Sequence, residues 1–245
     1  MVREAGWPVR GAAPALADSE VHLWLASLTL PEDRLAALAT ALTVDEQERA
    51  ARFRFPQHRD RFIAGRGLLR ELLGAYLDAP AAALRFRQGS RGKPALAGTL
   101  VGAGLHFNLS HSRDRALYAV ARRAVGVDLE ALDRWVDYAA VAERVCTGRE
   151  RTAFQALSAE RIQEAFFACW TRKEAVAKAI GEGLASGLNT LETCFREDEA
   201  PEGRVSLRDA VGREWSVLNV PLAPGWAGAL AAAGTDWRWV IRGAG

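Results

Sequence analysis

Two long helical patterns, each followed by strand-like segments, constrain the fold of this 245-residue chain more than any other feature. Apolar residues recur at helical spacing over residues 58–77 and again over 161–180. After the first pattern, strands are predicted at 105–109, 116–121 and 125–130. After the second, strands are predicted at 190–195, 215–221, 226–232 and 237–242. The chain therefore predicts an α+β fold of two similar halves, related by a pseudo-twofold axis.

Shorter segments complete this plan. A strand is predicted at 21–25, a helical region beginning at Pro31, and a charged helix at 45–52 that ends before Pro56. Residues 89–104 are predicted to form a loop, and two further helices are predicted at 137–145 and 148–157. The expected organisation is a flexible N-terminal lead at 1–19, an N-terminal half at 20–130 and a C-terminal half at 131–245.

Composition excludes several classes of protein. Hydrophobic residues make up 49% and charged residues 25%, as in ordinary globular domains. The net charge of +2 is too small to indicate a nucleic-acid partner. No apolar run reaches the roughly 18 residues of a membrane span, and no apolar region typical of a signal peptide begins the chain. We therefore expect a soluble, cytoplasmic protein without a membrane partner.

The three cysteines are odd in number, far apart and without a CxxC pair. This pattern argues against a disulfide framework or a thiolate metal site, and fits a reducing compartment. Cys169 lies in an apolar helical stretch, where a buried and inert thiol is the preferred interpretation.

A pair of carboxylates ends the apolar run Gly126-Val127-Asp128-Leu129-Glu130. Side chains two apart on a strand share a face, so Asp128 and Glu130 are expected to project together. Two adjacent carboxylates repel each other unless a cation or hydrogen-bond donors lie between them. Carboxylate oxygens suit Mg²⁺, although a solvated pair at a strand edge is the alternative.

A second group of polar residues lies on the predicted helix at 161–180. Trp170, Glu174 and Lys178 are spaced four apart and form one stripe on that helix. Strongly apolar turns precede them, which favours a position where the helix emerges into a site. An ordinary Glu-to-Lys surface pair is the alternative.

The segment Phe107-Asn108-Leu109-Ser110-His111-Ser112 is predicted to be a strand running into a small polar turn. Serine hydroxyls, turn amides and a histidine suit an oxyanion or phosphate. A Ser-His-Asp triad using Asp128 is the competing idea, but the chain has no G-x-S-x-G elbow, and adjacent Ser and His side chains do not easily face each other.

Four motifs in order now identify a resemblance. Gly92-Lys93-Pro94, the Phe107–Ser112 segment, Gly126–Glu130 and Trp170–Lys178 together resemble the surfactin-type 4′-phosphopantetheinyl transferases. The resemblance covers about residues 45 to 195, and the fold it implies places the active site in the cleft between the two halves. It also implies a magnesium-dependent transfer of phosphopantetheine from coenzyme A to a serine of an acyl or peptidyl carrier protein, with release of 3′,5′-ADP.

Roles follow from the resemblance at matched positions. The resemblance implies that Asp128, Glu130 and Glu174 bind Mg²⁺, that Glu174 activates the carrier serine directly or through water, and that Lys178 contacts phosphate. The expected coenzyme A contacts are Arg66, Lys93, Pro94, Ser110, His111 and Lys178. Independently of the resemblance, Arg59, Arg66 and Arg70 form one basic stripe on the first long helix, which is either a solvated face or a phosphate site.

The partners and two rival functions complete the expectations. Because both halves of the site come from one chain, a monomer is expected. Carrier proteins are acidic, so a docking surface is expected near residues 137–160, from Arg144, Arg149 and Arg151 with Val141, Val145 and Phe154. The rivals are a metal-dependent nucleotide hydrolase and a non-catalytic coenzyme A binding module.

Overall fold

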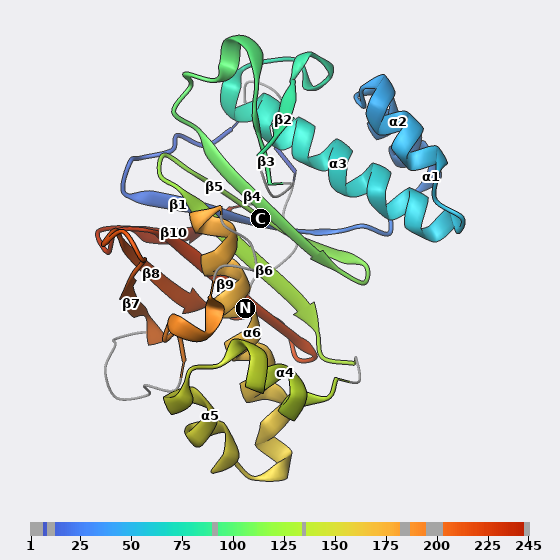
Figure 1. Ribbon diagram of the computed structural model, residues 1–245. Helices are drawn as coiled ribbons and strands as arrows, with labels where there is room; N and C mark the ends of the chain where they lie inside the picture. Colours follow the sequence, from blue (N-terminus) through green and yellow to red (C-terminus); the bar gives the residue numbers. More distant parts are fainter. Residues whose placement is uncertain are drawn as a thin grey trace.

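The computed structural model describes residues 7–8, 13–89, 93–133, 136–181, 187–194 and 203–242. Two four-stranded sheets and two 22-residue helices dominate it (Figure 1). The fold is α+β with two halves, as the sequence predicted. Part of the predicted N-terminal lead, Gly92 of the first motif, and Phe195 lie outside the described residues.

The first sheet has the strand order β10-β1-β5-β4. Its strands are β1 (Glu20–Ser27), β4 (His106–Ser112), β5 (Arg115–Ala121) and β10 (Arg238–Ile241). The helices of this half are α1 (Glu32–Thr40), α2 (Val44–Ala51) and α3 (Pro56–Leu77). Pro56 lies in the first turn of α3, where its missing N–H costs nothing.

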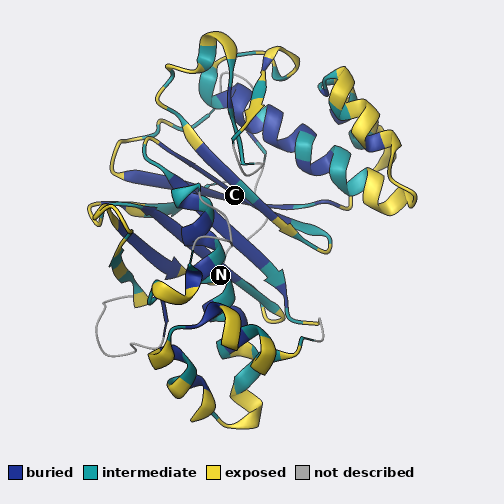
Figure 2. Ribbon diagram, viewed as in Figure 1, coloured by how far each residue is buried: buried dark blue, intermediate teal, exposed yellow. Residues whose placement is uncertain are grey.

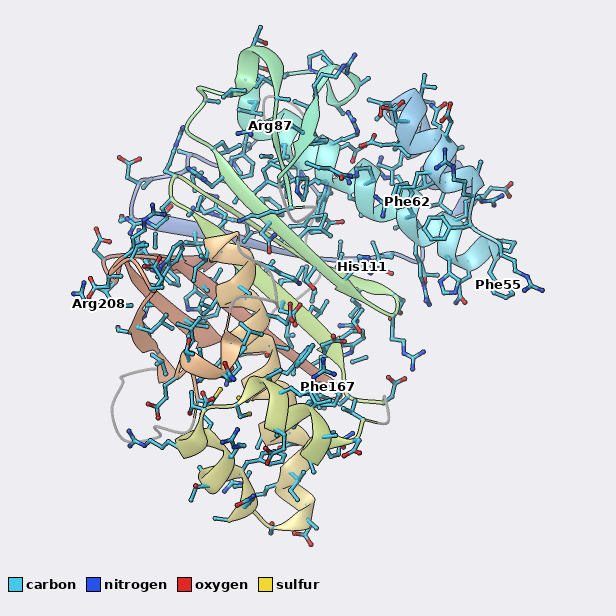
Figure 3. All side chains as sticks on the ribbon, viewed as in Figure 1. Phe55, Phe62, Arg87, His111, Phe167 and Arg208 are labelled. Atoms are coloured by element: carbon cyan, nitrogen blue, oxygen red, sulfur yellow. The ribbon has the colours of Figure 1, made fainter. Side chains whose placement is uncertain are left out.

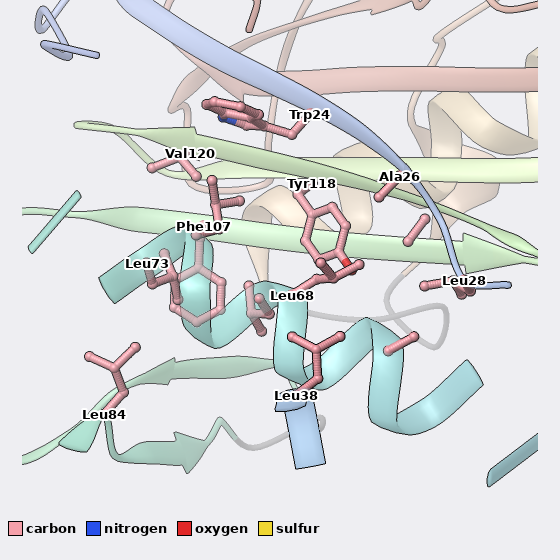
Figure 4. Close-up of a cluster of buried hydrophobic side chains, with 14 of the residues drawn as sticks. Trp24, Ala26, Leu28, Leu38, Leu68, Leu73, Leu84, Phe107, Tyr118 and Val120 are labelled. Atoms are coloured by element: carbon pink, nitrogen blue, oxygen red, sulfur yellow. The ribbon is translucent and has the colours of Figure 1, made fainter. Parts of the chain in front are cut away.

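Helix α3 covers one face of this sheet with a continuous apolar stripe. Leu68 and Leu73 from α3 pack with Phe107 and Tyr118 from the sheet, and all four are buried (Figure 4). The Tyr118 hydroxyl donates to the carbonyl of Gly65 at 3.1 Å, so the buried ring has a polar partner. This packing fixes the helix that carries Arg61 and Arg66.

The second sheet has the order β6-β9-β8-β7. Its strands are β6 (Val125–Ala131), β7 (Val205–Arg208), β8 (Glu214–Asn219) and β9 (Trp226–Ala233). The helices of this half are α4 (Tyr138–Val145), α5 (Gly148–Gln155) and α6 (Ala159–Ile180). Gly181 ends α6 in the left-handed conformation, with φ of 84°.

The two sheets pack on each other through their remaining faces. Val21 and Leu117 from the first sheet meet Val127, Leu129 and Leu230 from the second in one buried cluster. Figure 2 shows the central strands of the two sheets largely buried and the outer sides of α1, α2, α4 and α5 exposed. The molecule is therefore layered, with α3 and α6 outside and two sheets between them.

Strand pairing corrects the expected division of the chain. We placed residues 125–130 in the first half, but β6 pairs with β9 of the second sheet. The last strand, β10, runs parallel to β1 and so belongs to the first sheet. Glu20 anchors it, accepting from Arg238 at 2.7 Å and from Arg242 at 3.4 Å. The two halves are thus tied together by the end of the chain.

The segments predicted outside the two main sheets show further differences. The predicted loop 89–104 holds strand β3 (Pro94–Leu96), which pairs with β2 (Phe86–Gln88), and a 3₁₀ turn, η2 (Gly98–Leu100). Two other 3₁₀ turns are η1 (Ala81–Ala83) and η3 (Leu188–Thr190). Strand β7 was not predicted. The strand predicted at 190–195 is wrong for its described part, since residues 191–194 form no strand.

The reason is a set of buried side chains that take the place of a strand partner. Lys173 donates to the carbonyls of Leu188 and Leu191 at 2.9 and 2.7 Å, and Glu150 accepts from the Thr193 N–H at 2.8 Å. These bonds satisfy backbone groups that a ladder would otherwise pair.

Close packing of α6 on β6 depends on one glycine. A Cβ at Gly126 would lie 2.1 Å from the carbonyl oxygen of Ala175 and 2.4 Å from the Ala179 nitrogen. Those atoms belong to the helix backbone and cannot rotate away. Gly126 therefore sets the distance between β6 and α6, and with it the distance between Asp128 and the residues of α6.

We predict that Gly126→Ala displaces α6 and lowers the free energy of unfolding by about 2–4 kcal/mol, because the added methyl group overpacks a backbone contact. Urea denaturation measures this change. Gly102→Ala is the matched control, since a Cβ there meets nothing within 4 Å. Equal stability of the two variants would contradict the predicted role of Gly126.

Candidate active site

Three polar residues of β4 meet β6 side by side. The Asn108 Oδ1 accepts from the Val127 N–H at 2.8 Å, the Ser110 hydroxyl donates to Asp128 Oδ1 at 2.8 Å, and the Ser112 hydroxyl donates to Glu130 Oε2 at 3.0 Å. Residues on one face of β4 thus contact β6 at three successive points, the Val127 backbone and the Asp128 and Glu130 side chains. We call these contacts of Asn108, Ser110 and Ser112 with β6 the polar seam.

The position of the turn after β4 differs from the prediction. Ser110 and His111 were expected in a turn, but β4 continues to Ser112, which pairs with Arg115. The turn is the two-residue connection that follows, in which Arg113 has φ of 53°. The side chains of Ser110 and Ser112 therefore alternate with that of His111 instead of clustering with it.

The pair of carboxylates points as predicted. Asp128 is 3% exposed and lies on the face of β6 that carries Gly126, against α6, whereas Val127 and Leu129 point into the core between the sheets. Glu130 follows on the face of Asp128 and is half-buried. This position brings Asp128 into contact with Lys178, and both carboxylates near enough to Glu174 to raise its pKa.

Lys178 from α6 closes a three-element contact with Asp128. Its Nζ donates to Asp128 Oδ1 at 2.6 Å and to the Ser110 hydroxyl at 3.1 Å. The Lys178 side chain is 29% exposed and that of Asp128 is 5% exposed. The ammonium group of Lys178 thus neutralises the most buried carboxylate of the site. The Lys178 side chain itself remains partly open to solvent.

The pKa of Glu174, one turn before Lys178, is raised by its surroundings. Burial and the negative charge of Asp128 raise its pKa to about 7, Lys178 opposes them, and Glu130 adds to the increase. A carboxylate with this pKa is poised to accept a proton near neutral pH.

Four buried side-chain atoms have no hydrogen-bond partner in the part of the chain that the structure describes. Two are carboxylate oxygens, Asp128 Oδ2 and Glu174 Oε1, and two are guanidinium nitrogens, Arg61 Nε and Arg66 Nη1. Unsatisfied buried polar atoms cost about 1–3 kcal/mol each, so they indicate groups that await a ligand. The acidic atoms suit a cation and the basic atoms suit an anion.

His111 lies on β4, towards the hairpin that joins β4 to β5 (Figure 3). Its pKa is lowered by desolvation, and then by the positive charges of Lys178 and Arg61. His111 therefore connects Arg61 of α3 electrostatically with Lys178 of α6. Arg61 was not predicted as a site residue, because the helical stripe that we followed contained Arg59, Arg66 and Arg70.

The basic stripe itself divides into different roles. Arg59 pairs with its exposed neighbour Asp60. Arg70 is 1% exposed and donates to Glu46 at 2.7 Å and to two backbone carbonyls, so it supports the fold. Arg66 lies 3.3 Å from Glu46 through Nε and keeps Nη1 unpaired.

A cavity of about 740 Å³ lies between α2, α3 and the β2–β3 hairpin. Arg49, Arg66, Arg85, Phe86 and Pro94 line it. The guanidinium of Arg66 lies 5.4 Å from the centre of the Phe86 ring. Cationic groups beside an aromatic face suit a ligand with both phosphate and a planar ring. This cavity contains two of the predicted coenzyme-binding residues, Arg66 and Pro94.

Lys93 lies elsewhere and is already engaged. Its Nζ donates to the carbonyls of Val125 and Lys178, at 2.9 and 2.7 Å, and desolvation lowers its pKa to about 8. Lys93 therefore ties the start of β6 to the last turn of α6. Its predicted contact with coenzyme A stays a prediction.

A cation fits the acidic residues by donor chemistry. Two unpaired carboxylate oxygens and mutual repulsion among Asp128, Glu130 and Glu174 favour a hard cation such as Mg²⁺. Among the described residues, the one set of three with ligand atoms all within 4.8 Å is instead Cys146, Glu150 and Cys169. The three carboxylates are therefore spread more widely than that set.

Lys173, within the fourth motif, has a structural role. It forms a fully buried ion pair with Glu150 at 2.7 Å, and both side chains have zero exposure. The expected docking surface at 137–160 is also corrected, because Val145 and Phe154 are buried at 8% exposure. Arg149 and Arg151 pair with Glu192 and Glu143. A carrier contact through the arginines stays a prediction.

Among the described helices, none has the length and hydropathy of a membrane-spanning segment.

Comparison with known proteins finds two family models. Residues 124–231 match the 4′-phosphopantetheinyl transferase superfamily, and residues 30–122 match the N-terminal region of 4′-phosphopantetheinyl transferase. The boundary between them agrees with the division between β5 and β6.

Curated relatives agree with the family models. The chain is 42% identical to 4′-phosphopantetheinyl transferase HetI of Nostoc sp., over 91% of this chain and 92% of that protein. It is 31% identical to 4′-phosphopantetheinyl transferase psf-1 of Bacillus pumilus, over 71% of each. A 4′-phosphopantetheinyl transferase of Bacillus subtilis is 27% identical over 75% of this chain and 76% of its own.

The raised pKa of Glu174 predicts a pH-dependent stability. Its folded pKa is about 7 against an ordinary value of 4.5, so folding favours the protonated form. This contribution is intact below pH 4.5 and is lost as the pH rises through 7. Without divalent metal, Glu174→Gln should therefore gain about 2 kcal/mol over the natural protein between pH 5 and pH 8, after allowance for solvent screening.

Urea denaturation at the two pH values measures this gain. Glu164→Gln, at an exposed position of the same helix, is the control. A stability difference between Glu174→Gln and the natural protein that is the same at both pH values would refute the electrostatic account.

Lys173 and Lys178 give a second contrast. We predict that Lys173→Met lowers the free energy of unfolding by about 3–5 kcal/mol, because it leaves the buried Glu150 carboxylate unpaired. Lys178→Met should cost much less, since its ammonium group is partly exposed. Thermal or urea unfolding distinguishes the two, and a smaller loss for Lys173→Met would contradict the assignment.

Proposed function

The chain belongs to the 4′-phosphopantetheinyl transferase superfamily, and we propose that it uses Asp128, Glu130 and Glu174 to bind the Mg²⁺ that its reaction requires. The enzyme transfers the phosphopantetheine group of coenzyme A to a carrier protein. The observation that carries the proposal is the set of four unpaired buried atoms, two anionic from β6 and α6 and two cationic from α3. A metal and a pyrophosphate are complementary to those two sets.

The cation would lie on the α6 side of β6. Asp128 Oδ2 and Glu174 Oε1 lack partners, and Glu130 lies two residues from Asp128 on the same strand. When bound, Mg²⁺ supplies positive charge to the pyrophosphate and stabilises the charge that develops on the leaving oxygen. A bound cation would also hold Glu174 in its ionised form, by reversing the repulsion that raises its pKa.

We propose that Lys178 has two alternative hydrogen-bond acceptors, Asp128 and a phosphate oxygen of coenzyme A. In the structure it neutralises Asp128. We propose that it donates to a phosphate oxygen once a metal replaces it as the counter-charge of Asp128. Ser110 donates to Asp128 Oδ1 and so keeps that carboxylate oriented.

Glu174 is proposed as the general base. Its carboxylate would accept the proton of the carrier serine, directly or through water, as the serine oxygen attacks the β-phosphate of coenzyme A. The bond from that phosphorus to the bridging oxygen then breaks and releases 3′,5′-ADP. Positioning and charge stabilisation supply most of the rate enhancement in such transfers.

The nucleotide end of coenzyme A fits the cavity of about 740 Å³ beside α3. Arg66 offers its unpaired Nη1 to a phosphate, and Phe86 and Pro94 offer apolar surface to the adenine ring. The positive charges of Arg61 and Lys178 both act on His111. We propose that Arg61 and His111 contact the coenzyme's phosphates, and that Ser110 and Lys93 act by holding β4, β6 and α6 in place.

A monomer suffices for this site, because each residue named above belongs to one chain. A cytoplasmic location is part of the same proposal. It rests on three free cysteines without a disulfide.

The test of the proposal is the transfer itself. Incubation of an apo-carrier protein with coenzyme A and Mg²⁺ should raise the carrier's mass by roughly 340 Da, the mass of one phosphopantetheine group. Asp128→Asn and Glu174→Gln should each lower kcat by at least about a hundredfold while they retain the fold. Ser206→Ala, at an exposed position of the edge strand β7, serves as the control.

Release of 3′,5′-ADP distinguishes the rival functions. Release without any carrier would indicate a nucleotide hydrolase, and binding of coenzyme A without release in any condition would indicate a binding module. Either result, or no mass gain with carriers of several pathways, contradicts the proposal.

A further inference from the structure

All three cysteines of the chain lie together in one buried cluster that includes part of α6. Cys146 follows α4, Cys169 lies in α6 and Cys194 follows η3, and each is free and at most 5% exposed. The sulfur atoms of Cys146 and Cys169 are 3.9 Å apart. Cys169 also forms a hydrogen bond with Cys194. Cys169 is thus the shared neighbour of both other thiols, which their sequence spacing did not predict.

A cavity gives small molecules a route to this cluster. It has a volume of about 400 Å³ and is lined by Cys169 and Cys194, with Leu157, Arg161 and Arg172 around them. It lies on a part of α6 different from the one that carries Glu174 and Lys178. Two of the three thiols, Cys169 and Cys194, therefore border a space that a small oxidant can enter.

A metal ion is the weaker interpretation of the same cluster. Glu150 is the third group of the set that includes Cys146 and Cys169. Both of its oxygens are engaged, Oε2 with the Thr147 N–H and Lys173 and Oε1 with the Thr193 N–H. Because both Glu150 oxygens already have partners, and one of these is the buried Lys173 ammonium group, a metal ion would have to compete with these contacts for the carboxylate.

We propose that Cys146 and Cys169 form an oxidation site at which a hydroperoxide produces a reversible disulfide. One sulfur attacks the peroxide and becomes a sulfenic acid, with release of water from hydrogen peroxide. The other sulfur then attacks it, which forms the S–S bond and releases a second water. The balance is two thiols and one hydrogen peroxide giving one disulfide and two waters.

The geometry favours this pair. The sulfur atoms must approach from 3.9 Å to about 2.05 Å, a movement of the order of one side-chain rotation. The bond would link the end of α4 to α6, five residues before Glu174. Cys194 contacts Cys169 and can exchange with the disulfide once it has formed.

Mass spectrometry of the intact, folded protein tests the proposal. Treatment with hydrogen peroxide should lower the mass by about 2 Da, and a thiol reductant should restore it. Proteolysis without reduction should yield one linked peptide pair that contains Cys146 and Cys169. With peroxide, the mass of the Cys194→Ser variant should still fall by about 2 Da. The Cys146→Ser variant should yield no linked peptide pair that contains residues 146 and 169.

Peptide mapping of the natural protein keeps the test independent of how the variants fold. The proposal is overturned if the folded protein keeps three free thiols under peroxide concentrations that oxidise the urea-unfolded chain. It is equally overturned if the disulfide joins two molecules or excludes Cys146.

Discussion

The polar seam between β4 and β6 is the interaction on which the site depends. The two sheets pack through apolar faces, and such faces alone do not determine which residues oppose each other. Asn108, Ser110 and Ser112 fix that alignment, because each bonds to a particular residue of β6. A shift of one residue would leave these buried polar groups unpaired. The seam therefore sets where Asp128 and Glu130 lie relative to the first half.

Gly126 and Lys93 extend the same constraint to α6. The missing side chain of Gly126 lets the helix backbone approach β6, and Lys93 bonds to carbonyls of both elements. Glu174 is consequently held close to two other carboxylates although its pKa rises to about 7. Packing energy elsewhere in the fold maintains this unfavourable arrangement, which is what a binding site for a cation requires.

Periodicity over many residues made much of this predictable. Helices α3 and α6 each extend over six turns, so their apolar faces were recognisable, and alternation placed Asp128 and Glu130 on one face of β6. Short or side-chain-supported segments were not predictable. The strands β2 and β3 have three residues each, and residues 191–194 depend on Lys173 and Glu150 from distant positions. The proximity of Arg61 to His111, and of the three cysteines to one another, depends on tertiary packing. Local patterns in a single sequence do not reveal such packing.

The central claim is that three carboxylates from β6 and α6 hold one cation beside the coenzyme's phosphates. Anomalous diffraction from crystals of the protein with Mn²⁺ and coenzyme A tests it most directly. The account predicts one strong peak between Asp128, Glu130 and Glu174, with the pyrophosphate next to it. A peak at other carboxylates, such as those that line the cavity beside α2, or no peak within coordination distance of Glu174, would contradict it.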